Sequence, residues 1–572
     1  MTKVDGNGYT DTSKSNRFFA PVFPANEGAE QAAEPGNDKA TPHWKSWGIV
    51  PERSKTLTCY KKGFDSMFPR SSGILMHISS LPGEFGIGSM GREARLFVDF
   101  LHRAGERYWQ LLPLVPPGGG ASPYMSPSSA AGNPLFIDLP TLVDEGLLSW
   151  WDLEPYKYYD VDRVNYSWVY QVHENLLHKA YRNASPELMN EVYAFVNEDG
   201  GELMDYALFK ACSNHFGVPL LQWPDKNLLH RDEDAMNWYR ETLKDEIGYH
   251  AFCQYQFAKQ WRALKQYAND NGIQIIGDIP FYVSADSVDV WTHPDMFRIN
   301  RETMELDYVA GVPADMFSAT GQLWGNPIYD WDAHEADGYQ WWCNRIRRTN
   351  AFYDVIRIDH FRGFHTYWQI PSWSDSALTG EWKYGPGMKL LNAIHKHVPT
   401  AEFIAEDLGE LDKEATAFIK GTGIPGMRVL VDAFNTLADQ SSFLPHNCIP
   451  DSVMYTGTHD TPTFVQWYYT IANEGQRDFA RRYLHLNEQS GVSWGAMAGA
   501  WGSVCSLAMA QIQDVLSLGG DARMNAPGTM GDHNWSWRVR MNALNDEVIN
   551  RLRELNWLYG RLPEQNEEKP EE

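Results

Sequence analysis

Short apolar runs that end in a polar or acidic residue recur along this chain, and they restrict the fold more than any other feature. Such runs are typical of buried parallel β-strands, because both faces of a parallel sheet are covered. Helical patterns separate them, for example at 92–105 and at 252–272, where a glycine ends the pattern. The seven runs are GILMHI at 73–78, YWQLLPL at 108–114, IQIIGD at 273–278, VIRID at 355–359, FIAED at 403–407, MRVLV at 427–431 and VMYTGTHD at 453–460. This alternation predicts an α/β fold, a (β/α)8 barrel with one strand unplaced, and an open doubly wound sheet is the alternative.

The segments outside these runs predict the domain organisation. Residues 1–70 are rich in Gly, Pro, Asn, Ser and charge without an apolar period, which indicates a partly flexible N-terminal extension. The catalytic barrel is expected over 71–560, with a helical subdomain inserted at about 140–250 and a shorter insertion at about 280–345. Residues 561–572 read as an acidic tail.

Charge and cysteine usage exclude several classes of protein. Lys and Arg number 49 against 74 Asp and Glu, and this net charge of −25 would repel nucleic acid and anionic membranes alike. The six cysteines form no C-x-x-C pair, so neither a disulfide framework nor a zinc site is indicated. The N-terminus lacks the apolar region of a signal peptide and no run approaches 18 apolar residues. We therefore expect a cytoplasmic protein that binds neither nucleic acid nor membrane.

The aromatic content points to a ligand class. Aromatic residues make up 13% of the chain and include 23 Trp and 28 Tyr. Aromatic rings with a polar tip suit surfaces that grip a partly apolar, hydroxyl-rich ligand such as a carbohydrate. The alternative is that these rings fill a large core.

Carboxylates stand at the ends of four of the predicted strands. These are Asp278, Asp359, Glu406 (followed by Asp407) and Asp460. The active site of a barrel enzyme lies at the carboxyl ends of its strands, so four acids on one rim predict a catalytic site. For any one of them, capping of the following helix is the alternative. Arg357 lies two residues before Asp359, on the same face of the strand, where it can hold that carboxylate ionised.

The motifs that are absent narrow the chemistry. The sequence has no His/Cys cluster with metal-ligand spacing, no G-x-x-x-x-G-K loop and no G-x-S-x-G elbow, so we expect no metal and no cofactor. Paired carboxyls then favour glycoside chemistry, in which one is the nucleophile and the other, with a raised pKa, is the general acid/base.

Eight segments, in order, resemble the amylomaltases, the 4-α-glucanotransferases of glycoside hydrolase family 77, over residues 70–560. They are GILMHISSLPGEFGIGSMG, WQLLPLVPPGGGASPYMSPSSAAGNPLFIDL, GDIPFYVSADSVDVW, GVPADMFSATGQLWGNPIYDW, VIRIDHFRGF, IAEDLG, YTGTHDTPT and ARMNAPGTMGDHNWSWR. The resemblance implies a barrel of the α-amylase clan in which Asp359 is the nucleophile and Glu406 the general acid/base. It implies that Asp460 is the third carboxylate, which binds sugar hydroxyls. It also implies that Arg357, His459 and Asp278 support the side chains of the same subsite.

The resemblance also implies where the sugar chain binds. A loop over the active site carries four predicted sugar contacts: Asp315, Gln322, Trp324 and Asn326. Ser122 and Tyr124 belong to a segment that the family uses to stack glucan. For Trp324 and Tyr124, ordinary packing is the alternative, and His360 is expected to brace the loop after the nucleophile.

The expected substrates are α-1,4-glucans and maltooligosaccharides, with glucose among the acceptors, and the sequence names no protein partner. Three departures from the family pattern, Met125, Thr461 and Pro462, bear on acceptor preference or product size. Three alternative functions share this fold: an α-glucan hydrolase, a branching enzyme and a non-catalytic starch- or glycogen-binding protein. The three carboxylates argue against the last of these.

Overall fold

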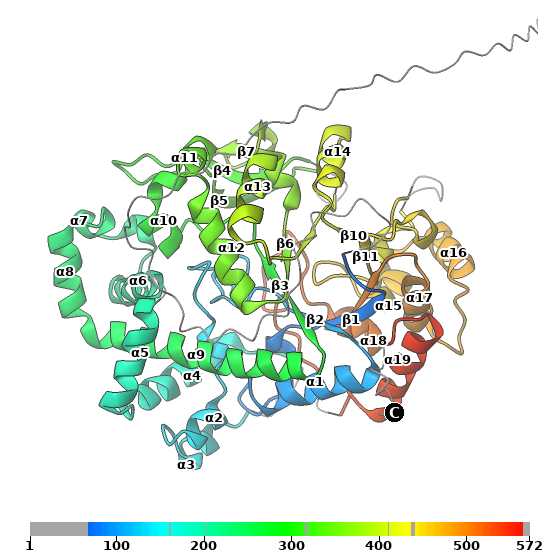
Figure 1. Cartoon of the computed structure of the whole chain (residues 1–572), viewed down its shortest axis with the longest axis horizontal. Coiled ribbons are helices and arrows are strands. Elements are labelled where there is room, and N and C mark those ends of the chain that lie inside the picture. The colour runs from blue at the N-terminus through cyan, green and yellow to red at the C-terminus, as the bar shows by residue number, and fades with distance from the viewer. Residues whose placement is uncertain are drawn as a thin grey trace, which may run out of the picture. The chain divides into compact units, whose positions relative to one another are not determined.

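A computed structural model describes residues 67–158, 162–198, 201–314, 319–409, 411–435, 441–540 and 542–563. Within these residues, eight parallel strands close into a barrel (Figure 1). Its strands, in spatial order, are β1 (Ser71–Leu75), β12 (Leu507–Gln511), β11 (Ser452–Tyr455), β10 (Gly426–Val429), β9 (Phe403–Ala405), β6 (Val355–Ile358), β3 (Gln274–Ile279) and β2 (Tyr108–Gln110). The predicted (β/α)8 barrel is therefore confirmed, and the open sheet is excluded.

Each of the seven predicted strands overlaps a strand of the barrel, and the unplaced eighth strand is β12. Its sequence, LAMAQ, has neither a β-branched nor an aromatic residue, so it lacks the composition that marked the other strands. All five of its residues are buried, which is why an apolar run of Ala, Leu and Met suffices there.

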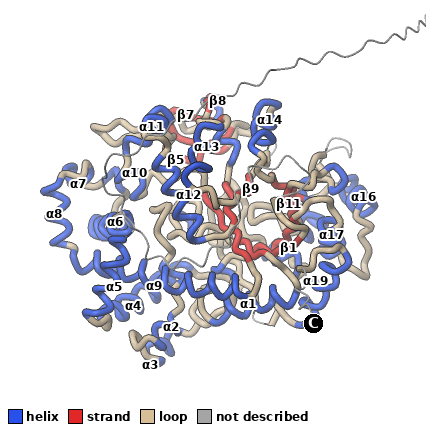
Figure 2. Tube along the Cα trace, in the orientation of Figure 1, coloured by secondary structure: helices blue, strands red, loops and turns tan. Residues whose placement is uncertain are grey.

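The connections carry the helices (Figure 2). The helix α1 (Arg92–Ala104) follows β1 and ends at Gly105, whose φ of 76° is the left-handed conformation that favours glycine. The connection from β2 to β3 contains α2 (Leu139–Asp144), α3 (Trp150–Leu153), α4 (Tyr166–Arg182), α5 (Pro186–Glu198), α6 (Glu202–Phe216), α7 (Lys226–Leu229), α8 (Glu233–Thr242) and α9 (Lys244–Asp270). The segment at 140–250 is thus helical where it is described.

The second insertion is only partly helical. It contains α10 (Val288–Thr292), α11 (Trp331–Ala336) and α12 (Gln340–Phe352), and also the strands β4 (Tyr308–Val312) and β5 (Gln322–Pro327). These strands pair with β7 (Thr366–Pro371) and β8 (Glu381–Tyr384), which follow β6, in an antiparallel sheet of order β5-β4-β7-β8. Two separate connections therefore build one sheet, which the expectation of helical insertions missed.

The last part of the chain completes the outer helices. Its helices are α13 (Met388–His397), α14 (Lys413–Thr422), α15 (Phe464–Gln466), α16 (Glu474–Tyr483), α17 (Val492–Trp501), α18 (Ile512–Val515) and α19 (Asp546–Leu558). None of the described helices is both long enough and apolar enough to cross a membrane.

Arg561 closes the seam between the first and last strands. Its buried guanidinium donates hydrogen bonds to the carbonyl oxygens of Ser71 and Ser506, at 2.7 and 2.9 Å, and to those of Trp501 and Cys505. The side chain at the start of the expected acidic tail is therefore part of the barrel wall. Most of the expected N-terminal extension, residues 1–66, lies outside the described residues.

Candidate active site

Strand register gathers the predicted acids at one end of the barrel. Asp278 pairs in register with Arg357 across β3 and β6, and Ile358 pairs with Ala405 across β6 and β9. Asp359 and Glu406 are the next residues on those two neighbouring strands, so both follow the carboxyl ends of their strands.

Arg357 is the cation of this rim. Its Nη1 atom donates to both carboxylate oxygens of Asp278, at 2.8 and 2.7 Å, and lies 3.0 Å from Oδ1 of Asp359. Burial opposes the charge, but the facing carboxylates hold the pKa of Arg357 well above its ordinary value. A permanently charged guanidinium therefore lies between two acids, as the spacing of Arg357 and Asp359 predicts.

Glu406 is held by the backbone. Its Oε2 accepts a hydrogen bond from the backbone N–H of His360 and its Oε1 one from that of Leu408, both at 2.8 Å. Burial, followed by the negative charge of Asp359, raises the pKa of Glu406 to about 7, against the opposing effects of Arg357 and the two N–H donors. This carboxyl can therefore both give and take a proton near neutral pH.

Asp460 has the opposite electrostatic environment. Burial acts to raise its pKa, but His459, the amide of Asn525 and Arg357 outweigh burial and hold the pKa of Asp460 at about 2. Asn525 Nδ2 donates to Oδ1 at 2.7 Å, and His459 Nε2 lies 3.3 Å from Oδ2. Asp460 is therefore an anion at any physiological pH.

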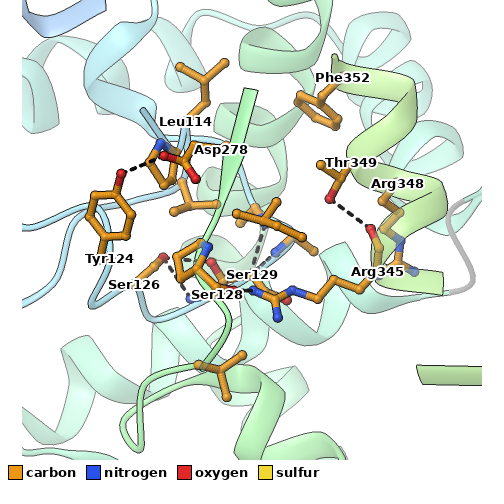
Figure 3. Close-up of a pocket in the computed structure, with 18 of the residues that line it drawn as sticks. Leu114, Tyr124, Ser126, Ser128, Ser129, Asp278, Arg345, Arg348, Thr349 and Phe352 are labelled. Carbon is orange, nitrogen blue, oxygen red and sulfur yellow. Dashed lines mark hydrogen bonds between the residues drawn. The ribbon is translucent and has the colours of Figure 1, made fainter. Parts of the chain in front are cut away.

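Tyr124 connects the 113–132 loop to the rim (Figure 3). Its hydroxyl donates to Oδ2 of Asp278 at 2.8 Å and lies 2.9 Å from His459 Nε2. Its ring stacks on the imidazole of His459 with centroids 5.3 Å apart. Tyr124 is therefore part of the hydrogen-bonded network of the site. The predicted contact Ser122 lies two residues away, and its Oγ accepts from the backbone N–H of Tyr124.

A pocket adjoins this network, between the 113–132 loop, the end of β3 and α12. Tyr124 and Asp278 line one side of it, and Arg345, Thr349 and Phe352 line another (Figure 3). Its volume of about 50 Å³ suits a few water molecules. Asp359, Glu406 and Asp460 are not among the residues that line it, so this pocket is beside the predicted catalytic site.

The other predicted contacts lie on or near β5. The indole of Trp324 packs edge-on against His360, with centroids 5.0 Å apart, and its N–H donates to Oε1 of Gln322 at 3.2 Å. Asn326 is buried, and its amide donates to the carbonyl oxygen of Val283 at 2.8 Å, which ties β5 to the segment that follows β3. Asp315 lies outside the described residues.

His360 turns the chain directly after Asp359. Its φ of 48° is left-handed, which is uncommon for a residue with a side chain. That turn accompanies the hydrogen bond from its N–H to Glu406, and the buried ring contacts Trp324. The predicted bracing role agrees with these contacts.

Asp407 follows Glu406 but does not join the site. Its Oδ1 accepts from the backbone N–H of Met427 at 2.7 Å, and its Oδ2 pairs with Arg428 at 2.9 Å. Neighbouring residues of an extended segment point to opposite sides, so only one of two consecutive acids faces the rim.

Asn525 and Arg523 are site residues that the sequence reasoning did not single out. In addition to the bond from Asn525 to the Asp460 carboxylate, Arg523 Nη2 donates to the Asp460 carbonyl oxygen at 2.7 Å. Both belong to the segment ARMNAPG, which lies within one of the segments that resemble the amylomaltases. A polar amide inside a Gly- and Pro-containing motif was the available signal.

Within the described ranges, no group of three or more His, Cys, Asp or Glu side chains is arranged to hold a metal ion. The local charges are instead balanced by Arg357 and His459.

Comparisons with known proteins agree with this geometry. The sequence model of glycoside hydrolase family 77, described as 4-alpha-glucanotransferase, matches residues 76–543. The chain is 43% identical over 488 residues to the 4-alpha-glucanotransferase of Clostridium butyricum, covering 85% of this chain and 100% of that protein. It is 41% identical over 561 residues to the chloroplastic/amyloplastic 4-alpha-glucanotransferase of Arabidopsis thaliana, covering 96% and 94% of the two chains.

The Arabidopsis match covers more of the chain than residues 71–572 could supply, so it reaches into the N-terminal segment that the motif resemblance left out. Among solved structures, the amylomaltase of Streptococcus agalactiae in complex with acarbose superposes with a TM-score of 0.83 at 39% identity, covering 86% of this chain and all of that one. On the rim geometry and these matches, the chain belongs to glycoside hydrolase family 77, the 4-alpha-glucanotransferases.

Proposed function

We propose that this chain performs the 4-alpha-glucanotransferase reaction of its family by a retaining double displacement, with Asp359 as nucleophile and Glu406 as general acid/base. The substrates are α-1,4-glucans and maltooligosaccharides, and the acceptor is the 4-hydroxyl of glucose or of a maltooligosaccharide. The observation that carries the proposal is the contrast between two neighbouring acids: Arg357 lies 3.0 Å from Asp359, whereas the pKa of Glu406 is raised to about 7.

In the first step, protonated Glu406 gives its proton to the glycosidic oxygen while Asp359 attacks the anomeric carbon. The C–O bond to the leaving chain breaks, and a covalent glycosyl ester forms on Asp359. Neighbouring strands lie about 4.8 Å apart, and this spacing favours the short carboxyl separation of retaining enzymes over the wider one of inverting enzymes.

In the second step, Glu406 is ionised and accepts the proton of the incoming 4-hydroxyl as that oxygen attacks the same anomeric carbon. The bond to Asp359 breaks, the α configuration is kept, and Glu406 is protonated for the next cycle. The role of Asp460, as a fixed anion beside His459 and Asn525, is to bind sugar hydroxyls and favour the distorted ring.

Transfer must also outcompete water for the glycosyl ester. Each tenfold preference for sugar over water requires about 1.4 kcal/mol of differential transition-state stabilisation. Trp324 is the group to which we assign this preference, because its indole packs on His360, the residue after the nucleophile. A ring there would hold the acceptor in line and exclude water. Gln322, Asn326, Asp315, Tyr124 and Ser122 are the proposed sugar contacts around it.

The test is incubation of the purified protein with maltotriose alone, followed by chromatography over time. Glucose together with a ladder from maltotetraose and maltopentaose upward supports transfer. Accumulation of glucose and maltose alone contradicts it and favours a hydrolase. An unchanged maltotriose peak contradicts both.

We also propose a cytoplasmic location. Four described cysteines, Cys212, Cys253, Cys343 and Cys505, are buried free thiols, and a reducing compartment keeps thiols in that state. Cell fractionation with an antibody to the chain tests this location.

A further inference from the structure

The antiparallel sheet β5-β4-β7-β8 has two different faces: one faces the predicted catalytic site, and the other carries exposed aromatic rings. Residues directly opposite each other on paired strands share a face. Leu323 of β5 is opposite Gly311 of β4, Gly311 is also opposite Trp368 of β7, and Trp368 is opposite Trp382 of β8. Trp324, next to Leu323, points to the other side, where it contacts His360.

We call the first side the outer aromatic face and define it by Leu323, Trp368, Trp382 and Tyr384. Tyr384 belongs to it because it lies two residues after Trp382 on β8. The exposed fractions are 43% for Leu323, 38% for Trp382 and 73% for Tyr384. The loop between β7 and β8 adds Trp373, which is 81% exposed. Such a concentration of exposed rings on one sheet marks a binding surface.

The rings of this face are held in place. The two indoles of Trp368 and Trp382 meet at a centroid distance of 5.1 Å, and the Trp368 N–H donates to the Ala377 carbonyl oxygen at 2.9 Å. The guanidinium of Arg362 lies 3.9 Å from the centroid of the Trp382 ring and also binds Asp412. Rings fixed in this way lose little side-chain freedom when a ligand stacks on them.

We propose that the outer aromatic face is a second α-glucan-binding site, which holds a remote part of a long chain while another part occupies the catalytic site. Indole and phenol rings suit the apolar faces of sugar rings, and their polar edges suit hydroxyls. The two cations beside the rings are paired, Arg362 with Asp412 and Lys383 with Glu381, so the face suits a neutral ligand better than an anionic one. The net charge of −25 disfavours a second copy of this chain or an anionic polymer as the occupant.

The position of the face links it to the reaction. Arg362, which packs on Trp382, lies three residues after Asp359, and β5 carries Trp324 on its opposite side. A glucan held on this face is tethered close to the catalytic rim, and tethering raises its effective concentration there. We expect a short oligosaccharide such as maltotriose to occupy one site at a time, so the benefit is confined to long chains. The proposal rests on the proposed function, because it assumes a glucan substrate.

The experiment compares Trp382→Ala/Tyr384→Ala with the wild-type chain. We expect KM for amylose to rise about tenfold, as expected for loss of a tethering contact, while kcat and KM for maltotriose change less than about twofold. Trp557→Ala removes an indole that is 67% exposed on α19 and is the matched control, with both substrates unaffected. Trp382→Phe, which keeps an aromatic ring, is expected to recover most of the amylose KM.

Direct binding is measured separately, by retardation in native gels that contain glycogen, with Asp359→Asn present in every variant to prevent turnover. Loss of retardation in the double variant supports the site. Unchanged retardation, or an equal rise in KM for maltotriose and amylose, overturns it. A dimer that dissociates on substitution while retardation is unchanged overturns it in favour of a subunit interface. Failure of the proposed function is distinguishable, because the wild-type chain would then give no products from maltotriose.

Discussion

Two acids of the same rim, Glu406 and Asp460, differ in pKa by about five units, near 7 against near 2. Glu406 has the anionic Asp359 beside it and accepts hydrogen bonds from backbone N–H groups. Asp460 is bound by the imidazole of His459 and the amide of Asn525. Desolvation acts to raise the pKa of both acids, so desolvation alone does not explain the difference. The sign of the nearest charge decides which acid carries a proton and which stays an anion.

The largest effect is expected from Asp359→Asn and Glu406→Gln. Each removes one half of the proposed acid and nucleophile pair, so maltotriose disproportionation is expected to fall by about 10⁴-fold. Asp407→Asn is the matched control, since Asp407 pairs with Arg428 away from the rim. An Asp407 variant that is as inactive as the other two, at equal thermal stability, would contradict the assignment.

Asn525→Ala removes a hydrogen bond that helps to keep Asp460 ionised. Removing a hydrogen bond to a charged group costs about 1.5–3 kcal/mol, so kcat/KM is expected to fall about 10- to 100-fold. Asn525→Asp should cost more, because it puts a second anion against Asp460. Steady-state kinetics on maltotriose measure the loss of kcat/KM in both variants. Equal activities for the wild-type, Ala and Asp forms would rule out a role of Asn525 in holding Asp460.

Trp324→Ala tests whether acceptor selection is separate from bond cleavage. We expect the ratio of transfer to hydrolysis to fall about tenfold, equivalent to about 1.4 kcal/mol, with a smaller loss of total cleavage. The ratio is read from oligosaccharide products against new reducing ends. An unchanged ratio of transfer to hydrolysis in the variant would contradict the proposal that this ring excludes water.

The smallest effect is a pH dependence. Because the pKa of Glu406 is about 7, the protonated acid is lost as the pH rises above that value, and kcat/KM should fall on the alkaline side with an apparent pKa near 7. In Asp359→Asn the neighbouring anion is gone, so the pKa of Glu406 should fall below that value. Carboxyl titration by infrared spectroscopy measures it, and an unchanged value would mean that burial alone raises the pKa.

The sequence predicted the parts of the fold that depend on local pattern. Seven strands were visible because a buried parallel strand is apolar throughout, whereas β12 escaped because Ala and Met do not mark a strand. The sheet β5-β4-β7-β8 was missed for another reason: its strands come from two connections, and pairing between distant segments leaves no local signal.

The residues of the site also differ in whether a local sequence pattern reveals them. The acids could be predicted because strand ends of a barrel converge, and the Arg-x-Asp spacing gave the partner of Asp359. The pKa of each acid could not, because it depends on partners that are distant in sequence, such as Asn525 for Asp460. Asn326 shows what the motif did not reveal: its amide donates a hydrogen bond to the Val283 carbonyl oxygen, while the sugar contact predicted for it stays a prediction.

Arg561 has a consequence for how this chain is made. The barrel closes only when β12 meets β1, and the side chain that bonds to both sides of that seam belongs to one of the last described residues. During synthesis from the N-terminus, β1 must wait with an unpaired edge until β12, the last strand of the barrel in the sequence, has left the ribosome. Shortening the chain by a dozen residues should therefore impair release of folded protein from ribosomes far more than its small share of the sequence suggests.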